Sequence, residues 1–155
     1  MYNVLENLPS VSHLVSVGIR DFSSDEQTYA KEAKKRVRVF YDAQLKEQKF
    51  SGITWKSQAE NIVSELPEKV WISFDIDGLD PKFCPSTGTP VPGGLDFYEA
   101  LFLFKTLVDS GRQIIGFDLC EVAPNAQSEW DANVGMRMLY QLAIWTIKSQ
   151  PPKNG

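Results

Sequence analysis

The sequence has 155 residues, enough for one domain with a sizeable core, and it is neither strongly apolar nor strongly charged. Hydrophobic residues make up 43% of it, charged residues 23%, and the formal net charge is −4. The scattered lysines and arginines do not form the basic surface typical of nucleic-acid binding, and no apolar run approaches the roughly 20 residues of a membrane span. We therefore expect neither a nucleic acid nor a membrane as a partner.

The start of the chain and its cysteines point to a cytoplasmic location. The first residues lack the charged and apolar regions of a secretory signal. Two cysteines, Cys84 and Cys120, are too few for a disulfide framework. Both are expected to be ordinary small buried residues in a reducing compartment.

Four strand-then-helix units follow one another along the chain. Runs of apolar residues predict strands at residues 13–19, 37–41, 70–76 and 113–119. Apolar stripes at helical spacing, together with capping residues, predict helices at residues 26–35, 54–66, 97–109 and 131–148. Alternating strands and helices predict an α/β fold, a three-layer α/β/α sandwich with a mainly parallel sheet, in a single domain over residues 1–155.

Two carboxylates end the third predicted strand. Asp75 and Asp77 are two positions apart, so in a strand their side chains point to the same face. Like-facing carboxylates repel unless a proton or a cation lies between them, and carboxylate oxygens suit Mg²⁺, Ca²⁺ or Mn²⁺. Glu121 follows the fourth strand, and α/β sheets place their sites at the carboxyl ends of strands. The pattern predicts a site here, although a capping or solvated pair of aspartates would also explain the two carboxylates alone.

The loop between the third strand and the third helix is unusually long. Residues 78–95 are too rich in proline and glycine for regular structure, and they include the run Pro85-Ser86-Thr87-Gly88-Thr89-Pro90. Connections of this length without secondary structure are uncommon unless they bind something. A binding loop beside the acidic pair is therefore expected.

Three segments resemble the ureohydrolase family, which includes arginases, agmatinases and formimidoylglutamases. Residues 73–95 read SFDIDGLDPKFCPSTGTPVPGGL and resemble a family signature. Residues 116–124, GFDLCEVAP, and residues 17–20, VGIR, are similar to further family elements. The resemblance covers nearly the whole chain and implies the C-terminal portion of the arginase-like fold.

The resemblance also implies an activity and roles for four residues. It implies Mn²⁺-dependent hydrolysis of the guanidino or amidino C–N bond of arginine, agmatine or a related compound, with release of urea and two Mn²⁺ ions in the site. Asp75 would bridge the metals and Asp77 would ligate one of them. Thr89 would lie near the substrate guanidinium, and Glu121 would hold that guanidinium in a bidentate pair. The expected partner is a small guanidino or amidino substrate, and the expected assembly is a homo-oligomer.

Two other family signatures do not occur in the sequence. They are a Gly-Gly-Asp-His run and an Asp-x-His-x-Asp run, and both supply metal ligands in the family. The sole histidine, His13, stands at the start of a strand, the end opposite to the site, and fits an ordinary structural or surface role. Two aspartates cannot fill two Mn²⁺ coordination spheres of about six ligands each. We therefore expect this chain to be inactive alone.

Two other functions stay open at this point. Asp75-Ile76-Asp77-Gly78 also resembles the start of haloacid-dehalogenase-type phosphatases, in which the first aspartate is a nucleophile beside Mg²⁺. That motif ends the first strand of its fold, whereas here two strand–helix units precede it, and Leu79 stands where a hydroxyl residue is usual. The third hypothesis is a non-catalytic α/β module that completes or binds another chain.

Overall fold

The computed structural model describes residues 1–33 and 35–152, and within them it contains four strands and six α-helices. In chain order the elements are α1 (Tyr2–Asn7), β1 (Leu14–Ile19), α2 (Ser24–Glu32), β2 (Val37–Tyr41), α3 (Asp42–Phe50), α4 (Trp55–Ser64), β3 (Lys69–Asp75), the 3-10 helix η1 (Ile76–Gly78), α5 (Phe97–Asp109), β4 (Gln113–Cys120) and α6 (Trp130–Lys148).

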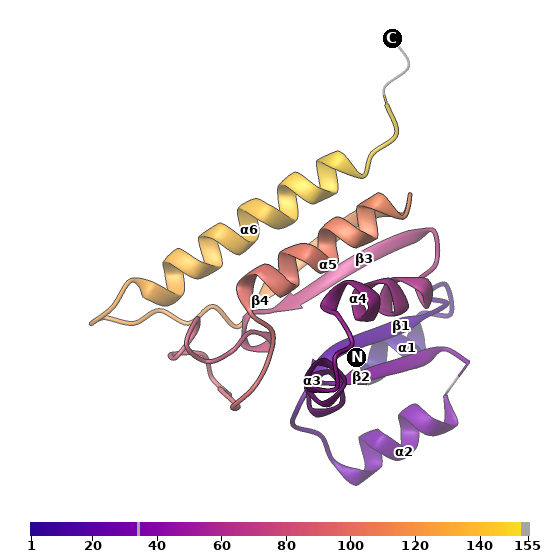
Figure 1. Cartoon of the computed structure of the whole chain (residues 1–155), viewed down its shortest axis with the longest axis horizontal. Coiled ribbons are helices and arrows are strands. Elements are labelled where there is room, and N and C mark those ends of the chain that lie inside the picture. The colour runs from indigo at the N-terminus through magenta and orange to yellow at the C-terminus, as the bar shows by residue number, and fades with distance from the viewer. Residues whose placement is uncertain (34, 153–155) are drawn as a thin grey trace.

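The strands form two parallel pairs, and the helices pack around them (Figure 1). β1 pairs with β2 and β3 pairs with β4, each in parallel register. The predicted α/β class and the parallel strand direction are confirmed. The difference from the expectation is that the strands form two two-stranded sheets, not one continuous sheet.

The predicted strands agree with the observed ones to within a residue, but the helices show larger differences. The predicted helix at residues 26–35 begins at Ser24, because Ser23 and Glu26 form a capping box, and it ends at Glu32. Lys34, within the predicted range, lies outside the described residues. α1 and α3 have no counterpart among the predicted helices.

One face of the β3–β4 pair carries the main core. α5 and α6 lie side by side over it in Figure 1, and the Phe74 ring contacts the Phe104 ring edge-on at 5.7 Å between centroids. The buried residues of this core come from η1, the long loop, α5 and α6: Ile76, Leu79, Cys84, Leu95, Ala100, Phe104, Val134, Met138 and Leu142. The core therefore fixes the end of β3 and the start of the loop, where the predicted site lies.

The opposite face of the β3–β4 pair is open in the described part of the chain. Trp71 and Ile115 are 59% and 55% exposed. The Trp71 ring lies over Gly116, where a Cβ would come within 2.3 Å of it, and its Nε1 donates a 2.7 Å hydrogen bond to Asp118 Oδ2. Burial alone would raise the pKa of Asp118, but hydrogen bonds from Trp71 and Ser73 lower it below its ordinary value. Asp118 thus organises this face, because its carboxylate accepts hydrogen bonds from Trp71, Ser73 and Cys120.

No helix within residues 1–33 and 35–152 is both long and apolar enough to cross a membrane.

Candidate functional site

The four predicted site residues come from three segments that meet at the carboxyl ends of β3 and β4. Asp75 is the last residue of β3 and stands opposite Cys120 in the strand register. Glu121 follows Cys120 directly, so both strand ends deliver a carboxylate to the same edge. The sequence expectation that Asp75 and Glu121 lie at one edge of a parallel pair is therefore confirmed.

β3 ends at Asp75 and not at residue 76 as predicted, so Asp77 does not continue the strand. Ile76–Gly78 forms η1, and the Asp75 side chain caps it by accepting a 3.3 Å hydrogen bond from the Asp77 backbone N–H. The strand-alternation argument for like-facing carboxylates therefore does not apply to Asp77. The turn itself brings the two residues together, as an aspartate that bonds the backbone two residues ahead commonly does.

The long loop closes over this turn, adds Thr89 to the site and lies against Glu121. Thr89 Oγ1 donates a 2.9 Å hydrogen bond to Asp77 Oδ2. Thr87 Oγ1 donates a 3.0 Å bond to the Glu121 carbonyl, and a Cβ on Gly88 would lie 3.3 Å from Glu121 Oε2. The Glu121 carboxylate therefore lies against the same stretch of loop that presents Thr89.

Two features mark this edge as unusual. Glu121 has a φ of 63°, a left-handed backbone that costs energy for any residue with a Cβ and that clusters at functional sites. Burial raises the pKa of the Asp75 carboxyl, and the negative charges of Asp77 and Glu121 raise it further. A carboxylate with two further carboxylates beside it is an arrangement that a cation or a guanidinium would stabilise.

The residues at this edge do not make a complete metal site. Within the described chain, no group of three or more His, Cys, Asp or Glu side chains is placed to hold a metal ion. His13 is exposed just before β1, with its Nδ1 3.0 Å from Ser12 Oγ, as expected for a surface role. Asp75 and Asp77 are oxygen donors of the kind that Mn²⁺ accepts, but two carboxylates do not fit the ligand set of one Mn²⁺, still less of two.

The first half of the loop is fixed by buried groups that sequence reasoning did not identify. Asp131, 2% exposed in the first turn of α6, accepts a 3.1 Å hydrogen bond from the Ser86 backbone N–H. Cys84 Sγ donates to the Ile76 carbonyl at 3.1 Å. Burial, together with the Asp131 charge, raises the pKa of Cys84 to about 11, so this thiol stays protonated and structural. Cys120 is exposed, so the expectation that both cysteines are buried is wrong for it; neither cysteine forms a disulfide.

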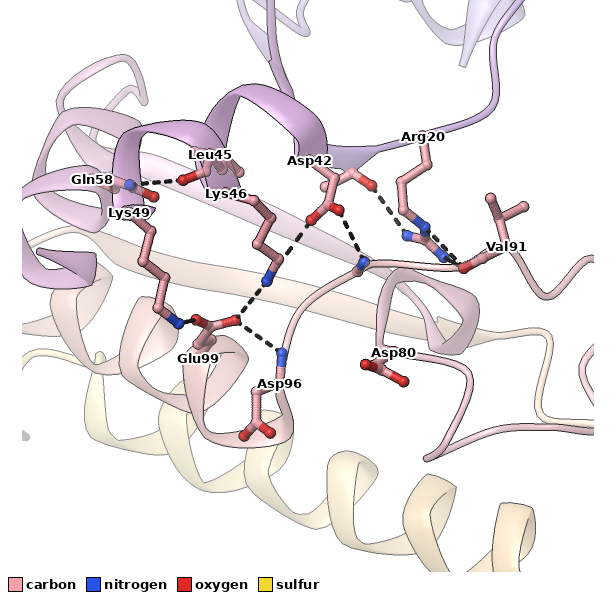
Figure 2. A network of polar contacts seen from close by, with 12 residues as sticks. Arg20, Asp42, Leu45, Lys46, Lys49, Gln58, Asp80, Val91, Asp96 and Glu99 are labelled. Atoms are coloured by element: carbon pink, nitrogen blue, oxygen red, sulfur yellow. Dashed lines mark hydrogen bonds and ion pairs between the residues drawn. The ribbon is translucent and has the colours of Figure 1, made fainter. Parts of the chain in front are cut away.

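The second half of the loop is tied to α3 by a polar network (Figure 2). Asp42, 5% exposed, accepts a 3.1 Å hydrogen bond from the Gly94 backbone N–H. Lys46 lies 3.3 Å from Glu99 Oε2 and 4.0 Å from Asp42 Oδ1, and Lys49 donates to Glu99 Oε1 at 2.5 Å. The only sequence signal for these side chains is their i, i+4 and i+7 spacing on one face of a short polar helix.

The chain is similar to ureohydrolases over nearly its full length. A family profile described as "Arginase family" matches residues 1–145. The N(1)-aminopropylagmatine ureohydrolase of Synechocystis sp. is 34% identical over 154 residues, which is 99% of this chain and 46% of that protein. The agmatinase of Serratia proteamaculans is 36% identical over 148 residues, 92% of this chain and 44% of that protein.

Solved structures show the same relationship. The proclavaminate amidino hydrolase of Streptomyces clavuligerus matches with a TM-score of 0.77 and 26% identity, over 96% of this chain and 48% of that one. A hypothetical agmatinase from Burkholderia thailandensis matches with a TM-score of 0.72 and 32% identity, over 95% of this chain and 43% of that one. The chain thus spans less than half the length of these relatives, and it has their arginase-like fold. This chain belongs to the arginase family.

Proposed function

We propose that this chain supplies the C-terminal part of a ureohydrolase site, one that hydrolyses the guanidino or amidino C–N bond of a small substrate such as agmatine or arginine and releases urea. The observation that supports it is the meeting of Asp75, Asp77, Thr89 and Glu121, four residues selected from the sequence, at one edge of the β3–β4 pair. Relatives named as an agmatinase and an aminopropylagmatine ureohydrolase support the substrate class. Residues 1–155 are then one domain portion within a larger ureohydrolase fold.

Each residue has a role that its chemistry allows. The Glu121 carboxylate accepts two N–H groups of a planar guanidinium, a bidentate pair that also fixes the orientation of the substrate. Thr89 Oγ1 keeps Asp77 oriented through their hydrogen bond. Asp75 and Asp77 would supply part of the ligand set for Mn²⁺, a Lewis acid that would activate water. The rest of that ligand set comes from polypeptide outside these residues, so the chain alone does not turn over substrate.

Urea release with and without a complementing polypeptide tests the proposal. The chain is assayed with Mn²⁺ on agmatine and arginine, alone and with the N-terminal half of the Serratia agmatinase, supplied in trans or fused upstream. We expect no urea from the chain alone and Mn²⁺-dependent urea after complementation. Phosphate release is measured on the same preparation with Mg²⁺. Phosphate without urea, even after complementation, would overturn the proposal in favour of the phosphatase hypothesis.

A folded complemented assembly that releases neither product would instead favour the non-catalytic module. The cytoplasmic location and the homo-oligomer belong to the same proposal. Fractionation of cells that express the tagged chain checks the first, and sedimentation of the complemented assembly checks the second.

A further inference from the structure

Arg20 connects three segments of the chain through their backbone carbonyl groups. It follows β1, and its Nη1 donates to the Gly18 carbonyl at 3.1 Å. Its Nη2 donates to the Asp77 carbonyl at 2.6 Å and to the Val91 carbonyl at 3.1 Å, and its Nε donates to Val91 at 3.2 Å. Figure 2 shows the guanidinium directed at Val91. One half-buried side chain thus holds the end of β1, the η1 turn and the long loop together.

The bonds of Arg20 are structural in kind. None of the ion pairs found among the described residues includes it, so its donors serve carbonyl oxygens and not a carboxylate. A guanidinium offers five N–H donors in a fixed planar fork, whereas a lysine offers a single point of attachment. The planar fork therefore fixes the relative position of two segments more rigidly than a flexible ammonium group does.

The two distant segments that Arg20 joins are the two sides of the Thr89–Asp77 hydrogen bond. Asp77 contributes its carbonyl to Arg20 and its carboxylate to Thr89, and Val91 is two residues beyond Thr89. The junction is tight, because a Cβ on Gly93 would lie 2.5 Å from Asp42 Oδ2 and 3.2 Å from Arg20 Cδ. Movement of Arg20 would therefore free both the Asp77 turn and the loop around Thr89, the two segments joined by the Thr89–Asp77 hydrogen bond.

We propose that Arg20 is a positioning residue that holds the Asp77 turn and residues 89–91 in one arrangement, so that Asp77 and Thr89 are oriented before any ligand arrives. The identity of that ligand rests on the proposed function, whereas the positioning role does not. Preorganisation of this kind matters because a misplacement of about 1 Å can cost roughly a hundredfold in rate.

Hydrogen exchange of single amides in the full chain tests the role without any activity. The reporters are the Leu95 amide, which donates to the Gly78 carbonyl, and the Asp80 amide, which donates to the Leu95 carbonyl. In Arg20→Lys we expect both to exchange about ten- to a hundredfold faster, the range set by losing hydrogen bonds to a charged group, while the β4 amides keep their rates. Unchanged exchange rates of the two reporter amides, or an equal increase in the rates of the β4 amides, would overturn the proposal.

Arg36→Lys is the matched control for this substitution. Arg36 is also half-buried and also donates to backbone carbonyls, those of Leu5 at 2.9 Å and Val11 at 2.7 Å, but far from the site. Arg36→Lys should leave the exchange rates of the Leu95 and Asp80 amides unchanged. If it accelerates them as much as Arg20→Lys does, the effect is general destabilisation and the positioning role is rejected.

A glycine pair repeats the test if Arg20→Lys does not fold. Gly93→Ala places a methyl group against Arg20 and Asp42 at a φ of +96°, whereas Gly52→Ala adds the same group at a φ of +91° with nothing within 4 Å. Both carry similar backbone strain, and only the first disturbs the junction. Faster Leu95 and Asp80 exchange in Gly93→Ala alone supports the proposal; equal exchange in the two variants contradicts it.

The complemented enzyme adds a functional readout. With saturating Mn²⁺, Arg20→Lys should lower kcat about ten- to a hundredfold and leave KM within about twofold, and Arg36→Lys should change neither. A normal kcat in Arg20→Lys would refute a positioning role in catalysis. If the unsubstituted assembly releases no urea, the proposed function fails, and the exchange rates still decide the role of Arg20.

Discussion

Thr89 Oγ1 donates a 2.9 Å hydrogen bond to Asp77 Oδ2, and this bond joins the middle of a proline- and glycine-rich loop to the turn that follows β3. A carboxylate has about four lone-pair sites, so Asp77 keeps acceptor capacity for a cation after this bond forms. Asp75 lies beside it and already bonds the Asp77 backbone N–H. The chain thus holds a preformed pair of carboxylates that still lacks most of a metal's ligands.

The first prediction concerns Mn²⁺ binding to the chain alone. Because two carboxylates cannot complete a coordination sphere of about six ligands, we expect calorimetry to show only weak binding. That weak binding should fall further in Asp75→Asn and stay unchanged in Asp109→Asn, a substitution on the exposed end of α5. Tight binding of two ions per chain that Asp75→Asn removes would show that the site is complete without another polypeptide.

The second prediction concerns Glu121 in the complemented enzyme. Glu121→Gln keeps the shape of the side chain and removes its charge, so the charge-assisted bonds to the guanidinium are lost. That loss of about 1.5–3 kcal/mol corresponds to roughly a ten- to hundredfold fall in kcat/KM if it falls wholly on the transition state. Steady-state kinetics on agmatine measure it, with Glu47→Gln on the exposed surface of α3 as the matched control. Equal kinetics in the two variants would remove Glu121 from the site.

A third prediction separates the proposed metal-ligand role of Asp75 from the proposed guanidinium-binding role of Glu121. Asp75→Ala should abolish urea release at every Mn²⁺ concentration, whereas Glu121→Gln should keep a residual rate that more substrate raises. Urea release measured across Mn²⁺ and agmatine concentrations distinguishes the two patterns. Recovery of Asp75→Ala by excess agmatine would contradict the assignment of Asp75 as a metal ligand.

The fourth prediction concerns pH and the network of α3. Burial raises the pKa of Glu99, but the bonds from Lys49, the Asp96 N–H and Lys46 outweigh it and hold the pKa below its ordinary value of 4.5. A carboxyl with a depressed folded-state pKa stabilises the fold above the unfolded-state value, and this stabilisation is lost as pH falls through the folded-state value. Glu99→Gln should therefore cost about 1 kcal/mol at pH 7, a discounted figure because both lysines are partly exposed.

Urea-denaturation midpoints between pH 7 and pH 3 measure this effect. The difference in midpoint between the unsubstituted chain and Glu99→Gln should be largest above pH 5. It should shrink as the pH falls below about 4.5. Glu60→Gln is the control, since its pair with Lys56 is exposed on both sides and is worth a few tenths of a kcal/mol at most. If the midpoint of Glu99→Gln falls further below that of the unsubstituted chain as the pH is lowered, the predicted direction of the Glu99 pKa shift is wrong.

The sequence predicted the parts of this fold that depend on local pattern. Four apolar runs became four strands, and Asp75 and Glu121 met because the carboxyl ends of parallel strands meet at one edge. α3 was missed because its polar sequence has no apolar stripe; its stability comes from tertiary contacts such as the Gln58 side chain donating to the Leu45 carbonyl at 3.0 Å.

Long-range backbone contacts account for the rest of what the sequence could not predict. Arg20 stands 57 positions from Asp77 and 71 from Val91, and its bonds are to carbonyl groups, which every residue carries. No residue type in the sequence marks those acceptors. The sequence pattern places the end of β3 one residue too far for a related reason, because the apolar residue Ile76 continues the strand pattern while the backbone has already turned into η1.

The last prediction concerns self-association through the open face of the β3–β4 pair. Trp71 and Ile115 are exposed on it, and parallel sheets are ordinarily covered on both faces. Exposed apolar patches on sheets attract partners, so we expect the isolated chain to associate with itself as its concentration rises. Ile115→Lys places a charge on this face and should shift the assembly toward monomer.

Sedimentation velocity over a concentration series measures the shift. The control is Phe50→Lys, because Phe50 is 85% exposed at the end of α3, and its replacement also exchanges an apolar side chain for a charge without touching the open face. Association that survives Ile115→Lys and falls in Phe50→Lys would place the contact elsewhere. A monodisperse monomer of the unsubstituted chain at high concentration would mean that the open face stays exposed to solvent without a partner. That result would favour a self-contained module over part of a larger ureohydrolase fold. Complementation should remove the self-association that depends on this face if the complementing polypeptide covers it, because the contact then becomes internal to the assembly; association through other surfaces would remain.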